Sequence, residues 1–79
     1  MDWKKIKCPQ GARLLKIHHF AFMVSGTNYQ IEIDEIGDGR FTGHAEDSID
    51  SSSVIESVTA DSLESCLNQV MESIKKRHS

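Results

Sequence analysis

The sequence predicts an α+β fold: a four-stranded antiparallel meander sheet with one C-terminal amphipathic helix packed on one face, in the order β-β-β-β-α. Two observations predict it. Residues 61–77 place apolar side chains at helical spacing, and the preceding runs alternate apolar and polar residues between glycine-containing turns. The helix has to bury its apolar stripe, and the strands supply the surface. At 79 residues the chain is long enough for one domain. We expect an irregular N-terminal arm over residues 1–11, strands and hairpins over 12–59, and the helix over 61–77.

The predicted helix has signals at both ends. Asp61 stands where an N-cap belongs, and Glu64, three residues later, would complete a capping box. The last turn contains three cations that complement the helix dipole, Lys75, Lys76 and Arg77. The apolar stripe between these ends consists of Leu63, Cys66, Leu67, Val70, Met71 and Ile74.

The first two strands form a predicted hairpin. The run from Arg13 to Val24 is rich in β-branched and aromatic residues, and the run after Asn28 alternates strictly. Gly26-Thr27 suits a two-residue type II′ turn, which requires glycine at its first position. That register pairs Val24 with Tyr29, Phe22 with Ile31, and Phe20 with Ile33. All six side chains then share the core face.

The third strand follows a turn at Gly37-Asp38-Gly39. A three-residue loop, with Gly39 in the left-handed conformation and a G1 bulge, keeps the hydrophobic pattern in phase. This loop length places three residues of the third strand on the core face, namely Phe41, Gly43 and Ala45. A polar loop over residues 47–52 and a short fourth strand over 53–58 complete the sheet.

Charge is distributed unevenly along a chain whose net charge is −3. Residues 1–19 hold five basic side chains against Asp2, whereas residues 32–64 hold ten carboxylates against Arg40. Phosphate binding requires the opposite sign, so nucleic acid is not expected as a partner. A basic protein fits better. A solvated acidic surface that keeps the protein in solution is the alternative.

Targeting and redox signals are weak. The chain shows no signal-peptide pattern and no apolar run long enough to cross a membrane, so a cytoplasmic protein with no membrane partner is expected. Cys8 and Cys66 could form one disulfide at most. Because Cys66 lies on the apolar stripe of the helix, we predict two free thiols.

A His/carboxylate patch is predicted on the sheet face away from the helix. The predicted registers put His19 opposite Asp34, with Thr42 next in the row, and Glu32 opposite His44. These side chains could hold zinc or another divalent ion, or perform acid–base chemistry. Ordinary cross-strand ion pairs are the alternative. We predict no cofactor and no catalytic residue; the metal-ligand candidates are His19, Glu32, Asp34 and His44.

One further histidine falls on the core side. His18 is expected opposite Glu35, as a partly buried and hydrogen-bonded side chain near the end of the sheet.

Residues 28–75 resemble the HicB-like antitoxin family. The segment YQIEIDEIGDGRF matches the family's alternating strand, acidic-glycine turn and aromatic residue. A short strand ending at Thr59 follows, and then a helix that keeps the family's register but has Ser62, Leu63 and Cys66 in place of its glutamate, alanine and asparagine. The resemblance implies a partial ribonuclease-H-like or double-stranded-RNA-binding-like fold and the neutralisation of a small basic ribonuclease toxin. The family's C-terminal DNA-binding module has no counterpart before Ser79, and the strand before residue 28 lies outside the family pattern.

Together these features predict a non-enzymatic protein-binding module, antitoxin-like or inhibitor-like, that presents an acidic sheet face to a basic protein. Two alternatives remain: a metal-binding or small hydrolytic protein that uses the His/carboxylate patch, and a homodimeric structural domain joined through an edge-lying first strand. The predicted partner-binding residues are His19, Glu32, Asp34, Arg40, Thr42, His44 and Glu46.

Overall fold

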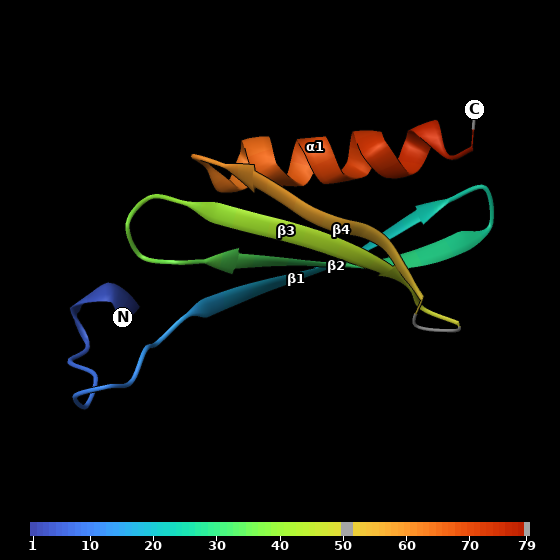
Figure 1. Ribbon diagram of the computed structural model, residues 1–79. Coiled ribbons are helices and arrows are strands. Elements are labelled where there is room, and N and C mark those ends of the chain that lie inside the picture. The colour runs from blue at the N-terminus through green and yellow to red at the C-terminus, as the bar shows by residue number, and fades with distance from the viewer. Residues whose placement is uncertain (50–51, 79) are drawn as a thin grey trace.

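The computed structural model describes residues 1–49 and 52–78 and shows the predicted α+β architecture (Figure 1). A short 3₁₀ helix, Trp3–Lys5, lies in the N-terminal arm. The sheet contains β1 (Lys16–Val24), β2 (Thr27–Glu35), β3 (Phe41–Asp47) and β4 (Ser53–Ala60), and α1 (Leu63–Lys76) follows. The strands are antiparallel in the order β1-β2-β3-β4, and α1 lies along one face of the sheet.

The core lies between α1 and the inner face of the sheet. The buried side chains that form it are Tyr29, Ile31, Ile33, Ala45, Cys66, Val70 and Ile74. The side chains predicted for the inner face of β1 and β3 pack against them, including Phe20, Phe22, Val24 and Phe41. α1 packs mainly over β4 and β3, and less over β2. The inner face of β1 therefore stays only half-buried.

Gly43 on β3 sets the distance between the helix and the sheet. A Cβ atom at this position would lie 2.9 Å from Cγ2 of Val70 and 3.0 Å from Sγ of Cys66, closer than van der Waals contact allows. The Cys66 thiol donates toward the carbonyl oxygens of Val58 (3.5 Å) and Phe41 (3.6 Å). Burial raises the pKa of this thiol, so it stays neutral at physiological pH. The two predicted free thiols are present, with Cys66 buried and Cys8 exposed.

The first hairpin has the predicted faces but a different register. The turn residues are Ser25 (φ 51°) and Gly26 (φ 79°), both left-handed, so the turn is type I′ rather than type II′. Val24 consequently pairs with Thr27, Phe22 with Tyr29, and Phe20 with Ile31. The predicted pairs were wrong by two residues. A shift of two preserves the side-chain alternation, so the same side chains still face the core.

The predicted three-residue loop of the second hairpin is confirmed. The amide of Ile36 donates to the carbonyl of Arg40 (3.1 Å), which leaves residues 37–39 as a three-residue loop, and Gly39 has φ 86°. β3 then pairs with β4, which continues to Ala60, two residues beyond the predicted end, because Ala60 pairs with Phe41. The register shifts twice along this pair, so β4 carries irregularities that the alternation pattern did not predict.

Two element ends differ from the prediction. β1 begins at Lys16 rather than Arg13. Lys16 pairs with Glu35, the last residue of β2, and after Glu35 the chain turns into the 37–39 loop, so β2 offers no strand partner to the residues before Lys16. The N-cap of α1 is Ser62, not Asp61: Ser62 has extended backbone and its Oγ accepts from the amide of Ser65 (3.0 Å). Part of the predicted 47–52 loop lies outside the described residues.

Replacing Gly43 with alanine should destabilise the fold. The added methyl group has to displace Val70 or Cys66, and overpacking of this kind costs about 1–3 kcal/mol. Urea denaturation would measure the loss. Ala21→Val, which adds carbon atoms at an exposed position of β1, is the control and should change stability by less than about 0.5 kcal/mol. Equal stability of wild type and Gly43→Ala would contradict the close helix–sheet contact.

Candidate functional site

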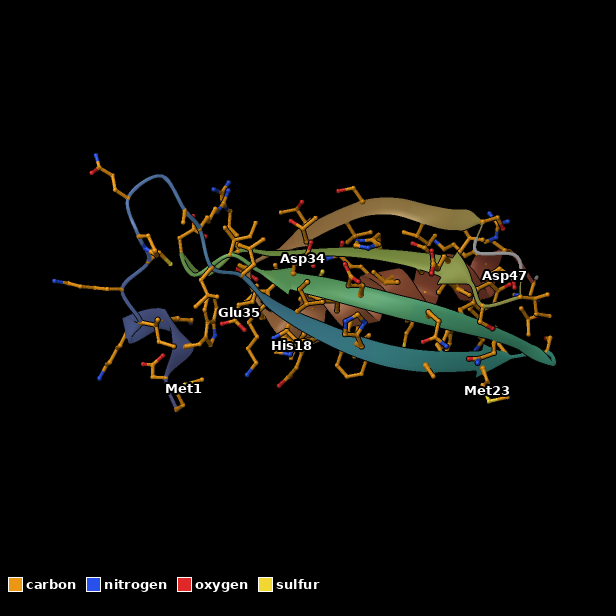
Figure 2. All side chains as sticks on the ribbon, turned by 90° about the horizontal axis from the view of Figure 1, so that it is seen from below. Met1, His18, Met23, Asp34, Glu35 and Asp47 are labelled. Carbon is orange, nitrogen blue, oxygen red and sulfur yellow. The ribbon has the colours of Figure 1, made fainter. Side chains whose placement is uncertain are left out.

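The sheet face opposite α1 is not covered by any described element (Figure 2). Strand alternation brings to this face side chains from β1, β2 and β3. We call this surface the outer face and define it by His19, Glu32, Asp34, Thr42, His44 and Glu46. All six belong to the predicted partner-binding set.

Glu32 lies at the centre of the outer face between two histidines. It pairs with His44 on β3, as predicted, and with His19 on β1. Its Oε2 lies 3.2 Å from Nε2 of His44, and its Oε1 lies 3.9 Å from Nδ1 of His19. The prediction that His19 stands opposite Asp34 was wrong, because the type I′ turn moves the register by two residues. The result is a continuous His–Glu–His row across three strands.

These histidine–carboxylate contacts add little to the stability of the fold. The His19, Glu32 and His44 side chains are 67%, 33% and 38% exposed, so solvent screens the pairs. Exposed pairs of this kind contribute about 0.2–1 kcal/mol. Substitutions on the outer face can therefore be used to test function without unfolding the protein.

Asp34 has a different environment. Its cross-strand neighbours are Ile17 on β1 and Thr42 on β3, and the Thr42 pairing was predicted. Its Oδ1 atom is shielded from solvent and has no hydrogen-bond partner among the described residues. A shielded carboxylate oxygen without a partner is costly. The outer face therefore holds one anionic group that a cation could stabilise.

Three of the four metal-ligand candidates converge. Glu32, Asp34 and His44 each offer a donor atom, and these atoms lie within 4.8 Å of one another. His19 lies outside this group, on the far side of Glu32. Chemically, the cluster can bind a metal cation or accept hydrogen bonds from a lysine or arginine side chain.

The other two predicted residues lie toward the ends of this surface. Arg40 precedes β3, is exposed, and forms an ion pair with Asp38 (Nη2 to Oδ2, 3.1 Å). The guanidinium group of Arg40 lowers the pKa of Asp38 below its ordinary value. Glu46 is exposed toward the other end of β3, where it pairs with Gln30.

The N-terminal arm reaches the sheet through an interaction that the sequence did not indicate. Glu35 Oε1 lies 2.9 Å from His18 Nε2, and its Oε2 lies 3.1 Å from Lys4 Nζ. The prediction that His18 stands opposite Glu35 was wrong, because its backbone partner is Ile33. His18 is partly buried and hydrogen-bonded, as predicted, and its partner is the Glu35 carboxylate. The role of Lys4 was missed because no pattern connects residue 4 with the end of β2.

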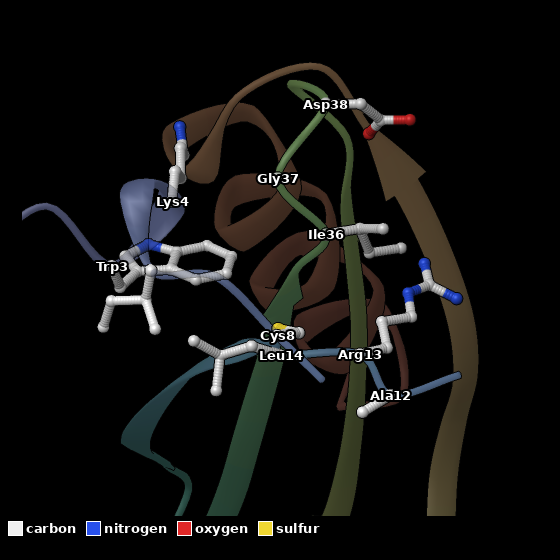
Figure 3. Close-up of a pocket in the computed structure, with 10 residues that line it drawn as sticks. Trp3, Lys4, Cys8, Ala12, Arg13, Leu14, Ile36, Gly37 and Asp38 are labelled. Carbon is white, nitrogen blue, oxygen red and sulfur yellow. The ribbon is translucent and has the colours of Figure 1, made fainter. Parts of the chain in front are cut away.

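A hollow of about 390 Å³ lies between the N-terminal arm and the β2–β3 turn (Figure 3). Trp3 lies against this turn: its Cη2 would be 3.7 Å from a Cβ atom at Gly37. The lining mixes apolar groups with charges of both signs, including Lys4, Arg13 and Asp38. No set of donor atoms converges there among the described residues, so the outer face is the stronger candidate.

Comparisons with protein-family models, with curated proteins and with solved structures found no match. The resemblance to HicB-like antitoxins thus stays a prediction. Among the described residues, α1 is too short and too polar to cross a membrane.

Replacing Glu35 with glutamine should make stability less dependent on pH in acid. Its hydrogen bond from His18 is the main reason that the pKa of Glu35 lies below its ordinary value of 4.5, and Lys4 adds to the effect. The folded protein therefore takes up this proton less readily than the unfolded chain. The stabilisation is complete above the ordinary value and is lost as pH falls through the lower, folded-state pKa.

Urea denaturation over a series of pH values from neutral to strongly acidic would measure this dependence. Glu72→Gln, which removes an exposed carboxylate of α1, is the charge-matched control. Parallel pH profiles for wild type and Glu35→Gln would contradict the assignment.

Proposed function

We propose that the protein is a non-enzymatic binding module, antitoxin-like or inhibitor-like, whose outer face binds a basic protein. The observation that supports this most is the uncovered sheet face with carboxylates at its centre. Glu32, Asp34 and Glu46 share this face, while the nearby cation, Arg40, is already paired with Asp38. Rigid strands hold these carboxylates in place, so a cationic partner would not have to order them first.

The proposed mechanism is charge complementarity followed by occlusion. The acidic face would accelerate the approach of a positively charged surface and fix its orientation. The bound sheet would then cover the partner's working surface. A small basic ribonuclease toxin, the partner that the HicB-like resemblance implies, has the required charge. The cytoplasm is the compartment where such a partner would be met.

Strand β1 would contribute at the rim of the interface. It lies at the edge of the sheet, so its outer backbone groups have no neighbouring strand in the described structure. Apolar side chains on it and just before it are exposed, namely Leu14, Leu15, Ile17 and Met23. An extended segment of a partner could pair with this edge.

Glu32→Gln combined with Asp34→Asn should weaken capture of a basic partner from the source cell lysate. Removing two surface charges, each worth up to about 1 kcal/mol, should lower affinity roughly tenfold and reduce its dependence on salt. Glu64→Gln with Glu72→Gln removes the same charge from exposed positions of α1 and should retain the partner. Equal capture by both double variants, or capture of no basic protein by wild type, would reject the proposal.

A homodimer through β1 is the second candidate function, favoured by the exposed apolar residues of this edge. Ile17 is 46% exposed and Met23 71% exposed. If two copies of β1 pair antiparallel about Phe20, Ile17 of each copy meets Met23 of the other on the outer side. β1 contains no carboxylate, and in this register neither Lys16 nor a histidine faces its own copy. The strand is therefore compatible with pairing to itself.

Ile17→Lys combined with Met23→Lys should abolish this dimer, because a charged edge opposes strand pairing. Sedimentation equilibrium would give the mass of each variant in solution. Ile49→Lys introduces a lysine at another exposed apolar position, outside the strands, and should leave the dimer intact. A wild-type mass equal to one chain at all concentrations would reject the dimer.

A further inference from the structure

The geometry of the outer face points to a binding site for a divalent first-row transition-metal ion, of which Zn²⁺ is the representative. Its ligands are Glu32, Asp34 and His44. This inference does not depend on the proposed basic partner. It rests on the separation of the donor atoms, on the unpartnered oxygen of Asp34, and on the rigidity of the two strands that carry the three residues.

The distances between donor atoms suit coordination of one ion. Zinc binds imidazole nitrogen and carboxylate oxygen at about 2.0–2.2 Å, so two ligands of a tetrahedral ion lie about 3.3–3.6 Å apart. Oε2 of Glu32 and Nε2 of His44 are 3.2 Å apart. The three donor atoms all lie within 4.8 Å of one another, so small side-chain rotations bring the third into range.

The environment of Asp34 supports the metal site independently of the distances between donor atoms. Its Oδ1 is shielded from solvent and has no hydrogen-bond partner among the described residues, although it carries part of a negative charge. Of its two cross-strand neighbours, Ile17 has no side-chain donor and Thr42 makes no hydrogen bond to this oxygen. A cation held with Glu32 and His44 would stabilise Asp34, which an ordinary cross-strand ion pair on this face does not do.

The backbone holds the ligands in place without a flexible loop. Glu32 and Asp34 are two residues apart on β2, so alternation directs both side chains to one face. His44 is the direct cross-strand partner of Glu32 on β3. Both strands are internal to the sheet, and a site on rigid elements loses little entropy when it binds an ion.

The donor set indicates the class of metal. An imidazole nitrogen with two carboxylates suits zinc and its first-row neighbours, whereas Ca²⁺ and Mg²⁺ prefer oxygen ligands alone. Three protein donors on an open face leave coordination positions for water or a further ligand. His19 is not counted among the ligands, because its Nδ1 lies 3.9 Å from the other oxygen of Glu32, beyond hydrogen-bond distance, and it falls outside the converging group.

Zn²⁺ titration of the full chain by isothermal calorimetry, in the presence of excess Mg²⁺, tests the site. Wild type should bind one ion per chain and gain thermal stability at saturation. His44→Gln and Asp34→Asn should each weaken binding at least about tenfold. Glu46→Gln removes a carboxylate from the same face but outside the cluster, and it should bind as wild type does. Circular dichroism would establish that each variant is folded.

The outcomes separate this inference from the proposed function. Zinc titration uses the isolated protein, and capture of a basic partner can be carried out with EDTA present, so each proposal can fail while the other holds. Retention of wild-type zinc affinity by His44→Gln and Asp34→Asn would overturn the site and assign the metal elsewhere, and absence of binding by wild type would overturn it as well. His19→Gln should lower zinc affinity less than His44→Gln does; an equal loss would contradict the ligand set of Glu32, Asp34 and His44.

Discussion

The close contact between α1 and β3 at Gly43 is the constraint on which the rest of the structure depends. Val70 and Cys66 approach Gly43 within 3.0 Å of where a side chain would begin, so the helix can lie low on the sheet. This approach buries the stripe of α1 against Tyr29, Ile31 and Ile33 of β2. Among the described residues, the core lies between one helix and one sheet face, so a poor fit at this contact would not be compensated by another packed layer of the described structure.

Because α1 packs on one face of the sheet, the other face is not covered by any described element (Figure 2). An uncovered face adds little to stability, so its residues are free to differ in chemistry from the core. Glu32 lies between two histidines there, and Asp34 keeps a shielded oxygen without a partner among the described residues. A cationic side chain and a metal ion would both satisfy these groups. Both proposals therefore follow from a single electrostatic feature, and they would compete for Glu32 and Asp34.

The sequence predicted the architecture because each signal is local and periodic. The stripe from Leu63 to Ile74 and the alternation on β2 required no knowledge of distant contacts. Register was harder to predict. Gly26 could be the first residue of one turn or the second residue of another, and only the left-handed backbone of Ser25 distinguishes them. Since the two registers differ by two residues, the faces of β1 and β2 were predicted correctly, whereas the partner of His19 was not. The contact of Lys4 with Glu35 depends on how the arm folds back, which no local pattern encodes.

The proposed function requires a basic partner to contact the outer face rather than α1. Amide chemical-shift mapping of the ¹⁵N-labelled protein, as the captured basic partner is added at low and then high salt, tests it most directly. We expect the shifts to concentrate on β2 and β3 around Glu32, Asp34 and His44 and to reverse as salt increases. Shifts confined to α1, or a pattern that salt does not change, would contradict it.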